Sequence, residues 1–157
     1  LPVFGAARIA GRPERAIAEI VSVFRPLGVV FQMQDDILDL YGDKGREAAG
    51  SDLREGKISV LVVEHVRLHP QDRIELLALL AAARDDTPQA AIEEFSRRFE
   101  AGGALAASLR RIEIEAERVR GSTVLMREPA LRDIAEELAA RVLEPITDVL
   151  RAHANRA

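Results

Sequence analysis

The sequence predicts an all-α protein, and three observations support this. Ala, Leu, Glu and Arg dominate its 157 residues, and these residue types favour helices. Apolar residues recur at steps of three and four through most of the chain, which is the spacing of one helix face. The β-branched run after Ile58 is the only segment typical of a strand, and a lone strand has no partner. We therefore expect helices throughout.

Helix-breaking residues separate the predicted helices. Gly11 and Pro13 end the first, and Pro70, Thr87-Pro88, Gly102-Gly103 and Pro129 mark later boundaries. Residues 42–56 contain four glycines among charged residues and are predicted to form a loop, while residues 121–126 are ambiguous. No low-complexity linker interrupts the chain, so we expect a single domain over residues 1–157. The predicted helices span residues 3–10, 14–40, 58–68, 71–84, 87–101, 104–120 and 129–153.

Composition excludes several classes of function. The net charge is −4 and Arg alternates with Glu along the helices, so no nucleic-acid surface is expected. Cysteine is absent, which excludes thiol chemistry and zinc thiolate sites. A cytoplasmic location fits the absence of cysteine. No apolar run reaches about 18 residues, so we expect no membrane span. Glu64 and Asp72 are expected at the surface, and His65 and His69 are expected in surface or capping roles rather than as metal ligands.

Three aspartates near the end of the long helix form a candidate metal site. At about 100° per residue, Asp35 and Asp39 lie about 40° apart in azimuth and about 6 Å apart along the axis. Gln32 lies on the same face. Two carboxylates so placed repel unless a cation lies between them, and hard oxygen ligands suit Mg²⁺. The run Asp35-Asp36-Ile37-Leu38-Asp39 therefore indicates a magnesium site, although a solvated acidic patch has the same pattern.

The apolar neighbours of these aspartates favour the metal interpretation. Phe31, Met33, Ile37 and Leu38 indicate that this helix packs inside a core, where charges usually face a cavity or a partner. About a dozen residues later comes the segment Gly50-Ser51-Asp52-Leu53-Arg54-Glu55-Gly56-Lys57. Its glycines let backbone approach a ligand, and Lys57 offers a compact positive charge for a phosphate. The segment is not a Walker loop, because that spacing is absent.

Together, the two segments resemble the second aspartate-rich region of trans-isoprenyl diphosphate synthases. The resemblance covers residues 31–60 sharply and the rest of the chain loosely. It implies a helical bundle of the isoprenoid synthase type, of which this chain is the C-terminal half. It also implies a homodimeric Mg²⁺-dependent prenyltransferase that condenses isopentenyl diphosphate with an allylic diphosphate and releases pyrophosphate. Geranylgeranyl diphosphate is the product expected from the general look of the loop.

The resemblance also implies a role for individual residues. Asp35 would ligate Mg²⁺ directly, and Asp36 and Asp39 would hold its water shell or neighbouring cations. Phe31 and Gln32 would face the isopentenyl diphosphate side, and Lys57 would bind the allylic diphosphate and stabilise the departing charge. Many members carry a Gly-Lys pair early in the loop; here Arg46 or Lys44 would take its place.

The family's first aspartate-rich motif is absent, as are its N-terminal basic residues that bind isopentenyl diphosphate. We therefore expect the chain to be an inactive fragment by itself. One alternative is a class I terpene cyclase, which is disfavoured because the Ser and Glu of its second motif are missing. Another is a non-catalytic regulatory partner of a full synthase, which would not need to keep the aspartates or Lys57.

Overall fold

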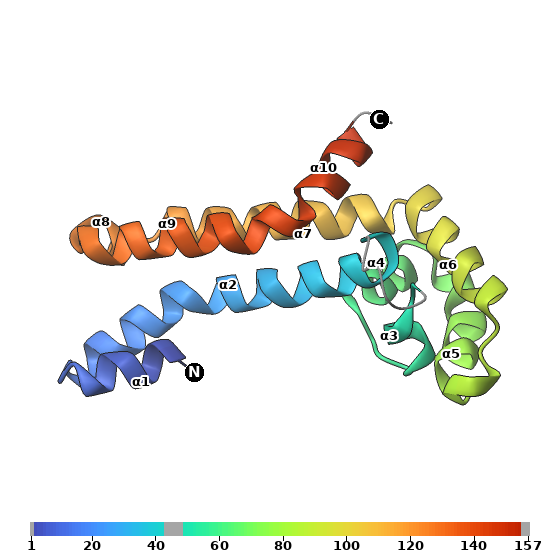
Figure 1. Cartoon of the computed structure of the whole chain (residues 1–157), viewed down its shortest axis with the longest axis horizontal. Coiled ribbons are helices and arrows are strands. Elements are labelled where there is room, and N and C mark those ends of the chain that lie inside the picture. The colour runs from blue at the N-terminus through green and yellow to red at the C-terminus, as the bar shows by residue number, and fades with distance from the viewer. Residues whose placement is uncertain (1, 43–48, 155–157) are drawn as a thin grey trace. The chain divides into compact units, whose positions relative to one another are not determined.

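The computed structural model describes residues 2–42 and 49–154, and within them it confirms the all-α prediction. Helices follow one another without a strand among these residues (Figure 1). The α-helices are α1 (Pro2–Ile9), α2 (Glu14–Tyr41), α3 (Ser51–Arg54), α4 (Val60–Leu68), α5 (Arg73–Ala81), α6 (Gln89–Ala101), α7 (Ala104–Arg120), α8 (Thr123–Arg127), α9 (Pro129–Leu143) and α10 (Thr147–Ala154). Short 3₁₀ turns occupy Pro70–Asp72, Arg84–Asp86 and Glu144–Ile146.

The observed helices differ from the predicted ones at three places, where a single turn of helix forms or where a longer helix is interrupted. The helix expected over 129–153 is divided by the 3₁₀ turn that contains Pro145, whose ring nitrogen has no N–H to donate. The ambiguous segment 121–126 contains α8, and the Ser122 hydroxyl accepts a hydrogen bond from the backbone N–H of Val124. The loop expected over 42–56 contains the single-turn helix α3. Hydrophobic periodicity cannot detect a helix of one turn.

Contacts divide the chain into two compact units. The first comprises residues 1–32 and 112–145, and the second comprises residues 33–111 and 146–157. In the first unit, α2, α7, α8 and α9 contribute to one buried cluster, in which small side chains of α9 allow close packing. The cluster comprises Val23, Leu27, Val119, Leu125, Ala135 and Ala139. Ala7, Ile17 and Ile20 form a second cluster that joins α1 to α2.

The second unit buries polar side chains as well as apolar ones. Its buried apolar residues include Ile37 of α2 and Phe99 of α6. The Glu64 side chain is only 2% exposed and accepts hydrogen bonds from Arg67 at 2.7 Å and Arg111 at 2.8 Å. Burial alone would raise the pKa of Glu64, but the hydrogen bonds and charges of the two arginines outweigh it and lower the pKa. The expectation that Glu64 lies at the surface is therefore wrong.

His65 is also buried, so a surface role is wrong for this residue. Its Nε2 lies 2.9 Å from Asp72 Oδ2, and its ring packs edge-on against Phe99 with centroids 5.0 Å apart. The neighbouring His69 contacts the Gly102 carbonyl through Nε2 at 2.8 Å. Both histidines therefore join α4 and the 3₁₀ turn after it to neighbouring elements.

By length and apolar composition alone, α2 would be able to cross a membrane, and no other described helix would. Its most apolar 18-residue window has a mean hydropathy of 1.5, and 33% of that window is buried. Core helices of soluble proteins share these properties, so this is weak support for a span. The expectation that the chain has no membrane span stays a prediction.

Candidate functional site

The three aspartates of α2 differ in their exposure to solvent. Asp35 is exposed, whereas Asp36 is 8% exposed and Asp39 is 5% exposed. At about 100° per residue, Asp39 lies between the other two in azimuth, about 40° from Asp35 and about 60° from Asp36. The buried side of this turn therefore carries Asp36 and Asp39, and the exposed side carries Asp35.

Asp36 contacts the N-terminus of α4. Its Oδ2 accepts a hydrogen bond from the backbone N–H of Val60 at 2.7 Å, and Val60 is the first residue of α4. The first N–H groups of a helix lack partners within the helix and carry its positive dipole end. The Asp36 carboxylate thus stabilises the N-terminus of α4 from a different helix.

Asp39 organises the segment that begins at Gly50. Its Oδ1 accepts from the Ser51 hydroxyl at 2.5 Å, and its Oδ2 accepts from the backbone N–H of Asp52 at 3.0 Å. The Gly50 N–H donates to the Asp39 carbonyl at 2.9 Å. Gly50 has a φ of +86°, a left-handed conformation that favours glycine. These contacts explain why α3 forms where the sequence predicted only loop.

Lys57 lies at the end of this segment between two carboxylates. Its Nζ is 2.7 Å from Asp52 Oδ1 and 2.8 Å from Glu55 Oε2, and its side chain is 57% exposed. Hydrogen bonds to Asp52 and Glu55 hold the pKa of Lys57 above its usual range. The ammonium is therefore charged at any physiological pH.

Gly56 sets the path of the chain into Lys57. It has a φ of +69°, and a Cβ added there would lie 2.5 Å from the Leu80 carbonyl oxygen. A larger residue would require α5 or the segment to move. The glycine predicted to allow a close ligand approach thus allows a close approach of another helix.

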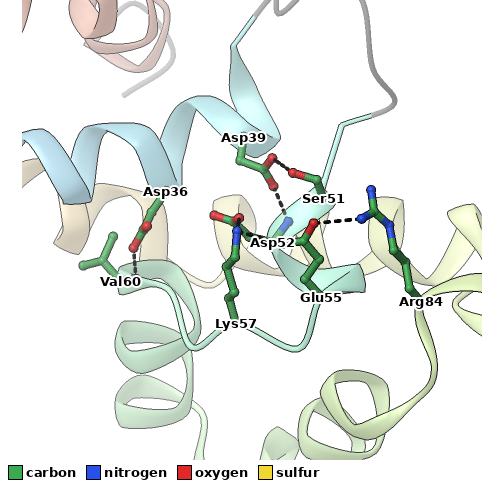
Figure 2. Close-up of polar contacts among 8 residues, drawn as sticks. All are labelled: Asp36, Asp39, Ser51, Asp52, Glu55, Lys57, Val60 and Arg84. Atoms are coloured by element: carbon green, nitrogen blue, oxygen red, sulfur yellow. Dashed lines mark hydrogen bonds and ion pairs between the residues drawn. The ribbon is translucent and has the colours of Figure 1, made fainter.

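These contacts join the aspartate helix to the lysine. Figure 2 shows Asp39 above α3, Asp52 bound to it through its backbone, and the Lys57 side chain extending toward Asp52 from below. The sequence predicted that the two segments lie together, and the structure brings Asp39 and Lys57 within two successive hydrogen-bonded steps. The structure therefore links the buried Asp39 of α2 to the charged amine of Lys57 through Asp52, and the exposed Asp35 lies one turn before Asp39 on the same helix.

Magnesium bound to these carboxylates would need further ligands from outside the described residues. Among residues 2–42 and 49–154, no three His, Asp or Glu side chains group as a metal site. Asp36 and Asp39 already accept hydrogen bonds from neighbouring backbone or hydroxyl groups. Mg²⁺ commonly binds one or two carboxylates and completes its shell with water and phosphate oxygens. The chemistry of Asp35 and its neighbours suits that arrangement.

Two further predicted residues precede the aspartates on α2. Phe31 is 59% exposed and Gln32 is also exposed, four and three residues before Asp35 on α2. The expectation that Phe31 packs inside a core is therefore wrong for this chain, whereas Met33 and Ile37 are buried as expected. Arg46 and Lys44 lie outside the described residues.

Sequence reasoning overlooked the structural role of Asp52, Glu55 and Ser51. Ser and Asp favour the first turn of helices, so Ser51-Asp52 directly after a glycine was the available signal. The pairing of Asp52 with Lys57 spans five residues, and neither helical nor strand periodicity places these positions together.

Comparisons with known proteins are consistent with one family. A family model described as polyprenyl synthetase matches residues 1–97, which include both segments of the site. A short chain isoprenyl diphosphate synthase of Methanothermobacter thermautotrophicus is 31% identical over 143 residues, covering 89% of this chain and 42% of that protein. The farnesyl pyrophosphate synthase of Mus musculus is 38% identical over 76 residues, covering 46% of this chain and 22% of that protein.

A solved structure has the same helical fold. A crystal structure of geranylgeranyl pyrophosphate synthase superposes with a TM-score of 0.66 at 25% identity, covering 90% of this chain and 44% of that chain. The predicted isoprenoid synthase fold is thereby confirmed. The chain spans less than half the length of these relatives.

Proposed function

Because the chain belongs to the polyprenyl synthetase family, we propose that it contributes one side of the active site of a magnesium-dependent prenyltransferase. The reaction would join isopentenyl diphosphate to an allylic diphosphate. The allylic C–O bond breaks, pyrophosphate leaves, the double bond of isopentenyl diphosphate attacks the allylic carbon, and a proton is lost. The single observation that carries the proposal is the contact chain from Asp39 through Asp52 to Lys57.

The described residues would divide the work on the allylic diphosphate. Asp35 would ligate Mg²⁺, with Asp36 and Asp39 in its surroundings, and the ion would supply Lewis-acid stabilisation of the leaving group. Lys57 would bind the same diphosphate and offset its growing negative charge. Phe31 and Gln32, exposed on α2, would face isopentenyl diphosphate.

Pyrophosphate is the probe that tests the site in this chain. Phosphorus-31 NMR detects weak binding, so pyrophosphate is titrated into the chain with and without Mg²⁺. We expect binding only with Mg²⁺, a loss of binding in Asp35→Asn, and an affinity about fivefold lower in Lys57→Met. Arg97→Met, which removes an exposed cation from α6 of the same unit, is the control. Equal binding by all four proteins would contradict the proposal.

Condensation of radiolabelled isopentenyl diphosphate with allylic primers tests the whole reaction. We expect the chain alone to be inactive and geranylgeranyl diphosphate to be the product of the complete enzyme. A second Asp-Asp-x-x-Asp motif encoded upstream of Leu1 would support this. Strong activity of the 157 residues alone would refute the expectation that this chain is inactive by itself. A chain that binds no Mg-pyrophosphate would favour a regulatory partner instead.

A cytoplasmic location and a homodimer complete the proposal. The family resemblance implies the homodimer, and the cytoplasmic location fits a sequence without cysteine. Cell fractionation tests the location. Analytical ultracentrifugation at micromolar concentration tests the dimer, and a sedimentation mass of one chain for the complete protein would contradict it.

A further inference from the structure

The two carboxylates beside Lys57 are held to different degrees. Asp52 Oδ1 and Glu55 Oε2 lie at almost the same distance from Nζ, 2.7 and 2.8 Å. The Asp52 side chain is 13% exposed, whereas that of Glu55 is 34% exposed. Glu55 also pairs with Arg84 at 3.0 Å through its other oxygen. The Glu55 carboxylate therefore has an alternative partner in a more hydrated position.

Asp52 is fixed through its backbone as well as its side chain. Its N–H donates to Asp39 Oδ2 at 3.0 Å, and its carbonyl accepts from the Lys57 N–H at 2.9 Å. Asp52 thus binds the backbone of Lys57, the ammonium of Lys57 and the aspartate-rich turn of α2. No comparable set of contacts holds Glu55 to α2 among the described residues.

We infer that Asp52 is a positioning residue for Lys57: it holds the ammonium beside the aspartate-rich turn of α2, where a diphosphate would bind (Figure 2). The inference rests on the proposed function of this site. A free lysine side chain loses rotamer freedom when it binds an anion. An ammonium that is already held loses less, so the diphosphate binds more tightly.

A competing electrostatic effect has to be separated from positioning. Each carboxylate also repels an incoming diphosphate, so its neutralisation by itself favours binding. Asp52→Asn and Glu55→Gln each remove one negative charge from the same ammonium at nearly equal distance. A difference between the two variants therefore measures positioning, since the change in charge is the same.

Lysine NMR gives a direct readout of positioning that needs no ligand. Lysine occurs only at positions 44 and 57, so the nitrogen-15 spectrum of the side-chain ammonium groups has two signals, and Lys44→Arg assigns them. We expect Asp52→Asn to bring the order parameter of the Lys57 ammonium close to that of a free lysine. We expect Glu55→Gln to leave it near the parent value. Equal order in the two variants would overturn the inference.

Titration with Mg-pyrophosphate tests the consequence for binding. We expect Glu55→Gln to bind at least as tightly as the parent, and Asp52→Asn to bind about fivefold more weakly than Glu55→Gln. If the parent binds and the two variants agree within about twofold, the inference fails while the proposed function stands. If the parent binds no Mg-pyrophosphate, the proposed function fails and the inference fails with it.

Circular dichroism verifies that each variant is folded. If Asp52→Asn loses helical signal, the experiment uses Asp52→Glu instead, and Glu55→Asp becomes the control variant. Both of these keep the charge and move the carboxylate by one methylene. A lower order parameter of the Lys57 ammonium and weaker Mg-pyrophosphate binding in Asp52→Glu than in Glu55→Asp would support the positioning role of Asp52. Equal values in the two variants would overturn that role.

Discussion

Replacing Asp36 by Ala should destabilise the second unit by removing the acceptor at the start of α4. The lost bond joins Asp36 Oδ2 to the Val60 N–H at 2.7 Å, and Asp36 is 8% exposed. A hydrogen bond to a charged group contributes about 1.5–3 kcal/mol. The interaction of the carboxylate with the helix dipole adds about 0.3–1 kcal/mol. Relief of repulsion with Asp39 returns about 0.2–0.5 kcal/mol. The free energy of unfolding should therefore fall by about 1.3–3.8 kcal/mol, with a central value of about 2.5 kcal/mol.

Urea unfolding and amide exchange measure this change. With a urea dependence of about 2 kcal/mol per molar, the midpoint should fall by about 1 M. The Val60 amide should also exchange faster with deuterium, because it no longer has an acceptor. This local probe is informative because the chain contains two compact units that need not unfold together.

Two neighbouring variants are the controls for Asp36→Ala. Asp36→Asn keeps an acceptor oxygen and should lose about half as much stability. Asp35→Ala changes an exposed residue on the same turn and should stay within about 0.5 kcal/mol of the parent. If Asp36→Ala costs no more stability than Asp35→Ala, the capping role assigned to Asp36 is wrong.

Three further predictions concern contacts elsewhere in the chain. Glu64→Gln should lower the free energy of unfolding by about 2 kcal/mol at pH 7. Because the pKa of Glu64 is lowered from 4.5, its contribution to stability is present above pH 4.5 and lost as the pH falls further. The melting temperatures of the parent and the variant should therefore become equal in acid. Burial raises the pKa of Tyr41 to about 12, so the contribution of Tyr41 to stability is present below pH 10 and lost as the pH rises from 10 to 12. In alkaline urea titrations the free energy of unfolding should therefore fall more steeply in the parent than in Tyr41→Phe over that interval, and equal slopes would contradict this. Gly56→Ala should cost at least about 2 kcal/mol of stability, because Gly56 has a positive φ and the added Cβ would meet the Leu80 carbonyl oxygen. Gly28→Ala, in α2 with nothing within 4 Å of the added Cβ, should stabilise the chain by about 0.5–1 kcal/mol. Thermal melting measures both changes, and melting temperatures equal to that of the parent would contradict both expectations.

The partners of Tyr41, Glu64 and His65 cannot be predicted from the neighbouring sequence. Tyr41 is the last residue of α2, two residues after Asp39, and the local sequence does not identify its partner. The structure shows its hydroxyl donating to the Ser96 carbonyl at 2.7 Å, which fastens α2 to α6. The position 55 residues away is set by the path of the whole unit. Glu64 and His65 were likewise misassigned because their partners Arg111 and Asp72 lie on other elements.

The helices themselves were predictable because their causes are local. Apolar spacing, proline and glycine boundaries and helix-favouring composition are all properties of short segments. The helix over residues 104–120 begins and ends where the sequence indicated. The errors occur at single turns, such as α3, whose stability comes from the side chain of Asp39 twelve residues before Ser51.

The aspartate run from Asp35 to Asp39 separates what the sequence determines from what only the tertiary structure determines. The sequence alone determined the helix, the shared face and the family resemblance, because helical geometry and residue order suffice for each of them. Only the tertiary structure separated an exposed Asp35 from the buried Asp36 and Asp39, and joined Asp39 to Lys57 through Asp52. Burial and hydrogen-bond partners depend on which elements pack against that turn, and the packing is a property of the folded unit.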